Sequence, residues 1–198
     1  MIRNIILDMG NVMLSYEPET YADRLCSKEA APIVLKELFL GPDWPKQDLG
    51  IIGREEIYDL VKARVPAEYH DDLKKAVWGW SKLMREIPGA KDFIREMKDA
   101  GYHIYVLSNA GKEFYEYFPA HYELSLFDGM VVSCDEHVRK PDPAIYEILL
   151  TRYGLDPSEC LFADDMPVNV EAAEEAGIKG FVFTGDYEAL KERVKSAS

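Results

Sequence analysis

The chain has 198 residues, 47% of them hydrophobic, and its 36 acidic and 23 basic residues give a formal net charge of −13 at pH 7. This length suits one domain, or one domain with an insertion, and it allows a sizeable buried core. The negative charge disfavours nucleic acid and anionic lipid as partners, and no apolar stretch approaches the roughly 20 residues that span a bilayer.

The first apolar stretch, residues 5–7, predicts a short buried strand that is followed at once by Asp8 and by a polar turn with Gly10 and Asn11. Ligands of α/β proteins bind just beyond the carboxyl ends of parallel strands. Asp8 is therefore a candidate nucleophile or metal ligand. An Asp after a strand is also a common turn residue or helix cap, so the later strand ends decide between these interpretations.

Residues 18–88 do not alternate between strands and helices, and their pattern predicts helices alone. The expected helices cover residues 19–27, 30–40, 54–65 and 67–83, with breaks at Gly41-Pro42, Pro45, Gly53 and Pro66. We therefore expect a helical domain of residues 17–88. It is inserted into an α/β core domain that consists of residues 1–16 and 89–198.

From residue 90 onward, expected helices and apolar strands alternate. The predicted strands are 102–107, 129–132, 160–163 and 180–183, and the predicted helices are 90–100, 143–153, 168–176 and a last helix from the cap Asp186 to residue 195. This alternation predicts an α/β fold, a doubly wound parallel sheet with helices on both faces.

Polar side chains stand at or near the carboxyl ends of the later strands, as Asp8 does at the first. They are Ser108, Asn109, Lys140, Asp164, Asp165 and Asn169. Turn, loop and capping roles are the alternatives for each of them taken singly. Their joint occurrence at one edge of a sheet instead favours a functional site.

Phosphoryl transfer is a chemistry that these residue types support. It needs an in-line nucleophile and cations around the phosphate oxygens. Asp8 can attack phosphorus and form an aspartyl-phosphate. Because a carboxylate repels a phosphate dianion, a cation is needed between them, and Mg²⁺ prefers oxygen ligands.

The strand-end motifs resemble those of the haloacid dehalogenase-like hydrolase superfamily in their order and spacing. They read Asp8-Met9-Gly10-Asn11, Ser108-Asn109, Lys140-Pro141 and Asp164-Asp165. The insertion after the first motif is similar to that family's helical C1 cap, on a Rossmann-like core. The first motif is most similar to that of bacterial sugar-1-phosphate phosphatases.

The resemblance implies a role for each of these residues. Asp8 is the nucleophile; Asp8, Asp165 and the carbonyl of Gly10 bind Mg²⁺. Asp164 and Asn169 support these ligands from behind. Phosphate is held by Ser108, Asn109 and Lys140, and the lysine also stabilises Asp8.

Gly10 departs from the common pattern of the family. Most of its phosphatases have a second Asp at that position, which protonates the leaving alcohol and later activates water. General acid–base help is worth about 10²–10⁴-fold. We therefore expect a preference for good leaving groups, such as those of anomeric sugar phosphates and acyl phosphates.

The function expected from these features is Mg²⁺-dependent hydrolysis of a small phosphate ester, such as a sugar phosphate. One alternative is a protein that binds a phosphorylated ligand or a partner with little turnover, because Gly10 replaces the acid. A 2-haloacid dehalogenase is less consistent with the sequence, since removal of a halide needs no acidic pair like Asp164-Asp165.

Aromatic residues in and near the predicted insertion are candidates for the substrate cleft or for simple packing. They are Tyr16, Trp44, Trp78 and Trp80. A second aromatic cluster, within residues 114–122, either packs a loop or forms a partner surface.

The chain begins without a secretory signal pattern, and Cys26, Cys134 and Cys160 show no zinc-site spacing. Three widely spaced cysteines fit reduced thiols. We therefore expect a cytoplasmic protein, either a monomer or a homodimer.

Overall fold

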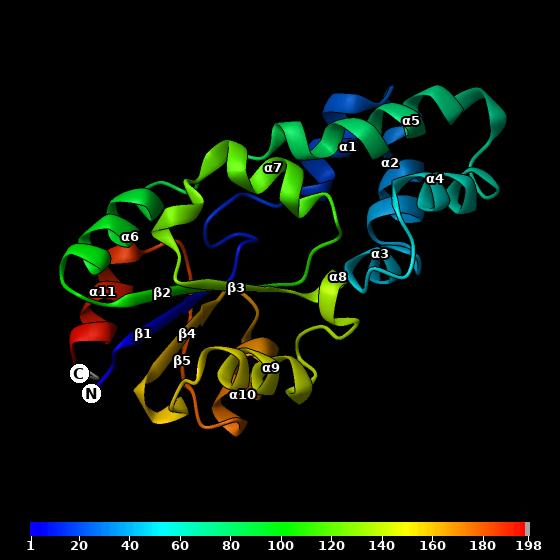
Figure 1. The fold of residues 1–198 in the computed structure, drawn as a ribbon. Coiled ribbons are helices and arrows are strands. Elements are labelled where there is room, and N and C mark those ends of the chain that lie inside the picture. The colour runs from blue at the N-terminus through cyan, green and yellow to red at the C-terminus, as the bar shows by residue number, and fades with distance from the viewer. Residues whose placement is uncertain (197–198) are drawn as a thin grey trace.

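A five-stranded parallel sheet forms the centre of the computed structural model, which describes residues 1–196 (Figure 1). The strand order is β3-β2-β1-β4-β5. The strands are β1 (Asn4–Leu7), β2 (His103–Ser108), β3 (Gly129–Val132), β4 (Cys160–Asp164) and β5 (Lys179–Val182). The chain leaves β1 for β2 on one side and later returns to β4 on the other. The crevice between β1 and β4 is therefore the topological switch point of this sheet.

Helices cover both faces of the sheet, as the alternation of strands and helices predicted. One face packs against α6 (Ala90–Asp99), α7 (Phe114–His121) and α11 (Tyr187–Ser196), and the other against α9 (Pro143–Tyr153) and α10 (Pro167–Glu175). Successive side chains of a strand point to opposite faces. Accordingly Ile5 and Leu7 belong to the first core cluster and Ile6 to the second. Because both faces are covered, all four residues of β1 are buried.

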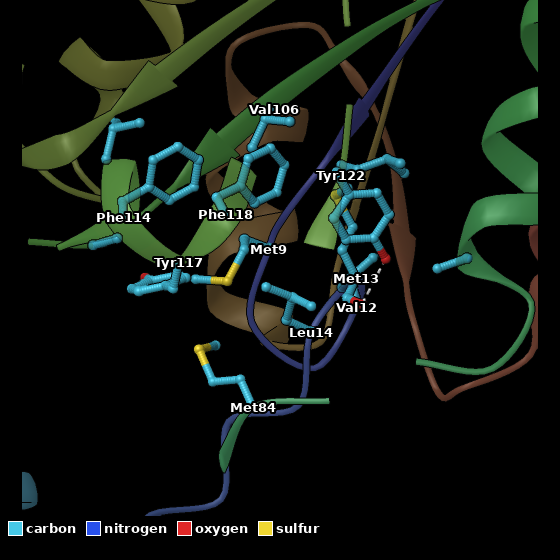
Figure 2. Packing of buried hydrophobic residues seen from close by; sticks show 14 of the residues in the cluster. Met9, Val12, Met13, Leu14, Met84, Val106, Phe114, Tyr117, Phe118 and Tyr122 are labelled. Carbon is cyan, nitrogen blue, oxygen red and sulfur yellow. Dashed lines mark hydrogen bonds between the residues drawn. The ribbon is translucent and has the colours of Figure 1, made fainter. Parts of the chain in front are cut away.

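Helix α7 lies over the loop that follows β1. The Phe118 ring stacks on Phe114 at 4.6 Å and on Tyr122 at 5.4 Å, and the Tyr122 hydroxyl donates to the Met13 carbonyl at 2.9 Å (Figure 2). The aromatic cluster of residues 114–122 is thus mainly a buried helix. Pro119 inside α7 obscured its periodicity in the sequence.

All regular secondary structure between residues 18 and 83 is helical, and we refer to these residues as the helical insertion. Its segments are α1 (Pro18–Leu25), α2 (Ala31–Val34), the π-helix η1 (Leu35–Phe39), α3 (Trp44–Asp48), α4 (Arg54–Lys62), η2 (Ala67–Tyr69), α5 (His70–Gly79) and η3 (Trp80–Leu83). The predicted break at Pro45 is wrong. Pro45 lies in the first turn of α3, where its missing N–H has no helical partner to lose.

The two connections of the insertion to the core lie side by side. The Ser15 amide donates to the Arg85 carbonyl at 2.8 Å, and the Ile87 amide donates to the Met13 carbonyl at 2.9 Å. The Ser15 hydroxyl also accepts a bond from the Arg85 amide at 3.0 Å. Entry and exit of the insertion are therefore tied together directly after the loop that carries Asp8.

A second contact joins the end of α3 to α8 (Ser133–Glu136), which follows β3 in the core. The Ser133 hydroxyl donates to the Asp48 carbonyl at 2.5 Å, and His137 Nδ1 lies 2.9 Å from the Leu49 carbonyl. Gly50 has φ +66°, and a Cβ atom there would lie 2.1 Å from the Cys134 carbonyl oxygen. The insertion thus approaches the core so closely that Gly50 leaves no room for a side chain.

The division into domains at residues 17 and 88 stays a prediction, although the helical insertion lies within those limits. Within residues 1–196, three α-helices, α3, α7 and α8, were not expected from the sequence, and neither were the 3-10 helices η4 (Leu124–Leu126) and η5 (Pro157–Glu159). Among residues 1–196, no helix combines the length and hydropathy that a membrane crossing requires.

We expect Gly50→Ala to loosen the insertion. Gly154 offers a matched control, since it has φ +62° and its surroundings leave open space for a Cβ atom. Both alanines incur the left-handed backbone cost of about 1–2 kcal/mol. Overpacking against Cys134 should lower the free energy of unfolding of Gly50→Ala by a further ~1–3 kcal/mol. Equal losses in urea unfolding of the two variants would contradict the close contact.

Candidate active site

The carboxyl ends of three neighbouring strands bring the predicted residues to one edge of the sheet. Asp8 follows β1, Ser108 ends β2 and Asp164 ends β4. The Asp8 amide continues the ladder by donating to the Ala163 carbonyl at 2.9 Å. The sheet register therefore places Asp8 beside Asp164 and Asp165.

Lys140 is the buried cation of this group, with 1% of its residue surface exposed. Its Nζ lies 2.7 Å from Asp8 Oδ1, 2.6 Å from Asp164 Oδ2 and 2.9 Å from the Leu107 carbonyl oxygen. An ammonium has three donors, and here each one has an acceptor.

Asn109 fixes the backbone of Lys140. Its side-chain oxygen accepts from the Lys140 amide at 2.8 Å, and its Nδ2 donates to the Lys140 carbonyl at 2.9 Å. The predicted role of Asn109 was to hold phosphate. In this structure its side-chain amide positions the lysine and Asn109 lines the cavity, so its role toward phosphate stays a prediction.

Asp164 is fully buried and its carboxylate is already well bonded. Besides Lys140, it accepts from Asn169 Nδ2 at 3.0 and 3.1 Å and from the Met166 amide at 2.8 Å. The Asn169 carbonyl in turn accepts from the Tyr146 hydroxyl at 2.7 Å. Asp164 and Asn169 therefore form a buried pair next to Lys140, and their support of the metal ligands, which the family resemblance implied, stays a prediction.

Asp165 is more open and is oriented from the first loop. Its Oδ2 accepts a bond of 3.0 Å from Asn11 Nδ2, and Asn11 Oδ1 accepts from the Tyr16 amide at 2.8 Å. Asn11 adopts a left-handed conformation, φ +53°, which Asn tolerates better than most residues. The motif Gly10-Asn11 thus links Asp8 to Asp165.

The site carries more negative than positive charge. Burial raises the pKa of Asp8 to about 7, Lys140 opposes this, and Asp164 and Asp165 add to it. Burial also raises the pKa of Asp165 above its usual range, although the bond from Asn11 lowers it. For Lys140, burial favours the neutral form, but Asp8 and Asp164 outweigh it and raise its pKa. A further cation would relieve this repulsion.

The donor set fits Mg²⁺. Carboxylate oxygens of Asp8, Asp164 and Asp165 lie within 4.8 Å of one another. Hard oxygen ligands are those that Mg²⁺ prefers. Since Asp164 is saturated by protein donors, Asp8 and Asp165 are the better placed ligands, and Gly10 lines the same cavity.

Ser108 ends β2 next to the site, but it is not among the residues that line the cavity. It is almost fully buried, and its hydroxyl has no hydrogen-bond partner within residues 1–196. A buried hydroxyl without a partner is costly. A phosphate oxygen is the kind of acceptor that would satisfy it.

A cavity of about 540 Å³ opens between these residues and the helical insertion. Of the four aromatic candidates, for which cleft lining and simple packing were both open, Tyr16, Trp44 and Trp80 line the cavity, whereas Trp78 packs on Tyr58. Other lining residues were not predicted from the sequence: Phe39, Leu40, Gln47, Asp48, Glu113, Tyr117, Arg139 and Met166. They have no motif spacing, and the folded chain alone brings them together.

Asp48 is the carboxyl group that the insertion adds to the cavity. Its side chain is 14% exposed, and its Oδ2 lies 3.5 Å from Nη1 of Arg139. Burial raises its pKa to about 6; Arg139 and Lys140 oppose this, and Glu113 adds to it. The charged form of Asp48 is therefore disfavoured in the folded protein.

Comparisons with known proteins agree with this geometry. A family profile for haloacid dehalogenase-like hydrolases matches residues 2–177. The sesquiterpene phosphatase astK of Aspergillus oryzae is 27% identical over 180 residues, which are 90% of this chain and 88% of that protein. The phosphorylated carbohydrates phosphatase of Thermotoga maritima is 27% identical over 186 residues, with coverages of 88% and 82%. Two longer relatives extend well beyond this chain, which spans 18% and 34% of them.

Among solved structures, a magnesium complex of the HAD family enzyme bt-2542 from Bacteroides thetaiotaomicron superposes with a TM-score of 0.77. The match covers 96% of this chain and 98% of that one, at 22% sequence identity. A likeness at this identity establishes the shared fold, an α/β core with helices on both faces.

We expect Asp48→Asn to stabilise the protein in a pH-dependent way. The carboxyl has a pKa of 3.8 when unfolded and about 6 when folded, so the wild type loses stability as pH rises through this window. Above pH 6 the variant should be more stable by on the order of 2–3 kcal/mol, and near pH 3.5 the difference should vanish. Asp59→Asn, on the exposed surface of α4, is the control in urea unfolding at each pH. A pH-independent difference would contradict the raised pKa.

Proposed function

The chain belongs to the haloacid dehalogenase-like hydrolase family, and on this basis we propose that it is a Mg²⁺-dependent phosphatase of small phosphate esters. The observation that carries the proposal is the position of Asp8. Its carboxylate is held on one oxygen by buried Lys140, beside Asp165 and at the floor of a cavity. Relatives named as phosphatases support the same reaction class.

In the proposed reaction, Asp8 attacks the phosphorus of the ester in line with the leaving oxygen. A bond forms between Asp8 and phosphorus, and the bond to the leaving oxygen breaks with its electron pair. Water then attacks the aspartyl-phosphate and releases inorganic phosphate, which restores Asp8. Per turnover, one ester and one water give one alcohol and one phosphate.

The residues proposed to hold Mg²⁺ are Asp8, Asp165 and the carbonyl of Gly10. When bound, the ion would neutralise phosphate charge facing the Asp8 carboxylate. Lys140 keeps Asp8 oriented and adds positive charge, while Asp164 and Asn169 hold the lysine in place. The Ser108 hydroxyl is proposed to donate to a phosphate oxygen.

Gly10 supplies no proton to the leaving oxygen. The leaving group must therefore be stable as an anion or take its proton from water. The rate of phosphate release separates the phosphatase from the first alternative, a binding protein that would show little turnover. A 2-haloacid dehalogenase would release halide without Mg²⁺, and three clustered carboxylates are a poor environment for a departing anion.

Asp8→Asn tests the nucleophile. We expect wild-type protein to release phosphate from acetyl phosphate with Mg²⁺, to lose this activity with a chelator, and to lose it by at least about 10³-fold in the variant. Mass spectrometry after acid quenching should show one added phosphoryl group on the wild type and none on the variant. Asp99→Asn, at the exposed end of α6, is the matched control. Halide release from a 2-haloacid, or phosphate release that survives in Asp8→Asn, would refute the proposal.

Gly10→Asp tests the missing acid. A Cβ atom at Gly10 meets nothing closer than 3.8 Å, so the substitution is sterically allowed. We expect wild-type protein to favour acetyl phosphate strongly over ethyl phosphate, which is similar in size but has a poorer leaving group. The variant should raise ethyl phosphate turnover by about 10²-fold or more and affect acetyl phosphate little. An unchanged ratio of the two rates would show that another group already protonates the leaving oxygen.

A further inference from the structure

Five aromatic side chains line the same cavity as the proposed phosphate site, and we call them the aromatic wall. They are Tyr16, Phe39, Trp44, Trp80 and Tyr117. Neighbouring rings contact each other, with centroid distances of 5.1 Å for Phe39–Trp44, 5.4 Å for Trp44–Trp80 and 5.6 Å for Trp80–Tyr117. Most of these pairs are tilted or edge-to-face, so the wall is a rigid packed surface.

The wall continues to the cavity mouth, where two large apolar side chains remain in solvent. Leu40 is 66% exposed and Met166 is 50% exposed, and both line the cavity. Exposed apolar groups at the rim of an apolar pocket are typical of ligand sites.

Several polar groups of the cavity are already bonded to or paired with protein partners, whereas the buried Gln47 Oε1 has no hydrogen-bond partner within residues 1–196. Asn109 is bonded twice to the backbone of Lys140, Asp48 lies beside Arg139, and Glu113 faces Arg54 at 3.4 Å. A sugar has several hydroxyl groups that need partners once they leave water. Away from the phosphate site, Gln47 Oε1 is the buried lining atom within residues 1–196 that lacks a partner, so most hydroxyl groups of a sugar would find none there.

The charge of the cavity disfavours a second anionic group on the substrate. Beyond the phosphate site, its lining contains the carboxyl groups of Asp48 and Glu113 and a single cation, Arg139, beside Asp48. A carboxylate on the leaving group would meet like charge in a partly buried place.

We infer that the substrate is the phosphate monoester of a neutral, apolar aromatic hydroxyl compound, such as a phenol or naphthol, whose flat face packs on the aromatic wall. This inference rests on the proposed phosphatase function and narrows it to one substrate class. A cavity of about 540 Å³ accommodates a fused ring system beyond the phosphate. An aryl leaving group also suits Gly10, because a phenolate departs more readily than an alkoxide without an acid.

The test compares phosphate esters in which the reactivity of the leaving group and the size of its apolar part vary separately. Phenyl and 2-naphthyl phosphate have similar leaving groups but differ by one fused ring. We expect kcat/KM for 2-naphthyl phosphate to exceed that for phenyl phosphate by about tenfold or more, from the added apolar contact. It should also exceed the values for glucose 1-phosphate and phosphoglycolate. Acetyl phosphate, too small to reach the wall, reports the phosphatase reaction itself.

Two variants test whether the aromatic wall causes the preference for 2-naphthyl over phenyl phosphate. Trp44→Ala removes a central ring, and Leu40→Gln changes an exposed side chain that has little part in folding. Each should lower the ratio of 2-naphthyl to phenyl phosphate kcat/KM several-fold. Trp78→Ala, on the Trp that lies outside the cavity, should keep the ratio.

The outcomes separate this inference from the function it rests on. Failure of every ester, acetyl phosphate included, would refute the phosphatase. Turnover of acetyl phosphate with no preference for the naphthyl ring, or with faster turnover of glucose 1-phosphate, would refute the apolar substrate alone. An unchanged ratio in both Trp44→Ala and Leu40→Gln would equally refute the role of the wall.

Discussion

The buried ammonium of Lys140 is the constraint on which this site depends. It is nearly inaccessible to water and touches carboxylates from two adjacent strands, Asp8 after β1 and Asp164 at the end of β4. A buried charge is tolerated when it is paired and fully hydrogen-bonded. Because one cation cannot balance three acids, the arrangement is incomplete by itself and is suited to a divalent ion and a phosphate.

The sequence predicted the core of the fold and most of the acidic site, because both rest on local patterns. Pro143–Tyr153 begins and ends as predicted, since Asp142 caps its first turn and Gly154 adopts φ +62° at its end. The residues near Asp8 were found from their places at strand ends. Parallel strands in a doubly wound sheet necessarily bring those ends to one edge. Membership in the hydrolase family confirms the family that these motifs indicated, while the roles of the individual residues stay predictions.

The cavity could not be predicted in the same way. Asp48, Glu113 and Tyr117 come from α3, the start of α7 and α7 itself, and they meet because α3 docks on α8 through Ser133 and Gly50. That contact joins residues more than 80 positions apart and has no periodic signal. For the same reason, the sequence did not show that Trp80 lines the cavity while Trp78, two residues earlier, packs on Tyr58.

The two hydrogen-bonded segments at the base of the insertion have a mechanical consequence. The entry segment runs from Asn11 through Ser15 to Tyr16, and its partner at Arg85 leads back to the core. A movement of the insertion about these two segments would displace the Tyr16 amide. That amide donates to the side chain of Asn11, and Asn11 donates to Asp165. A displacement of the insertion would therefore be transmitted to the carboxylate of Asp165, one of the groups proposed to bind Mg²⁺.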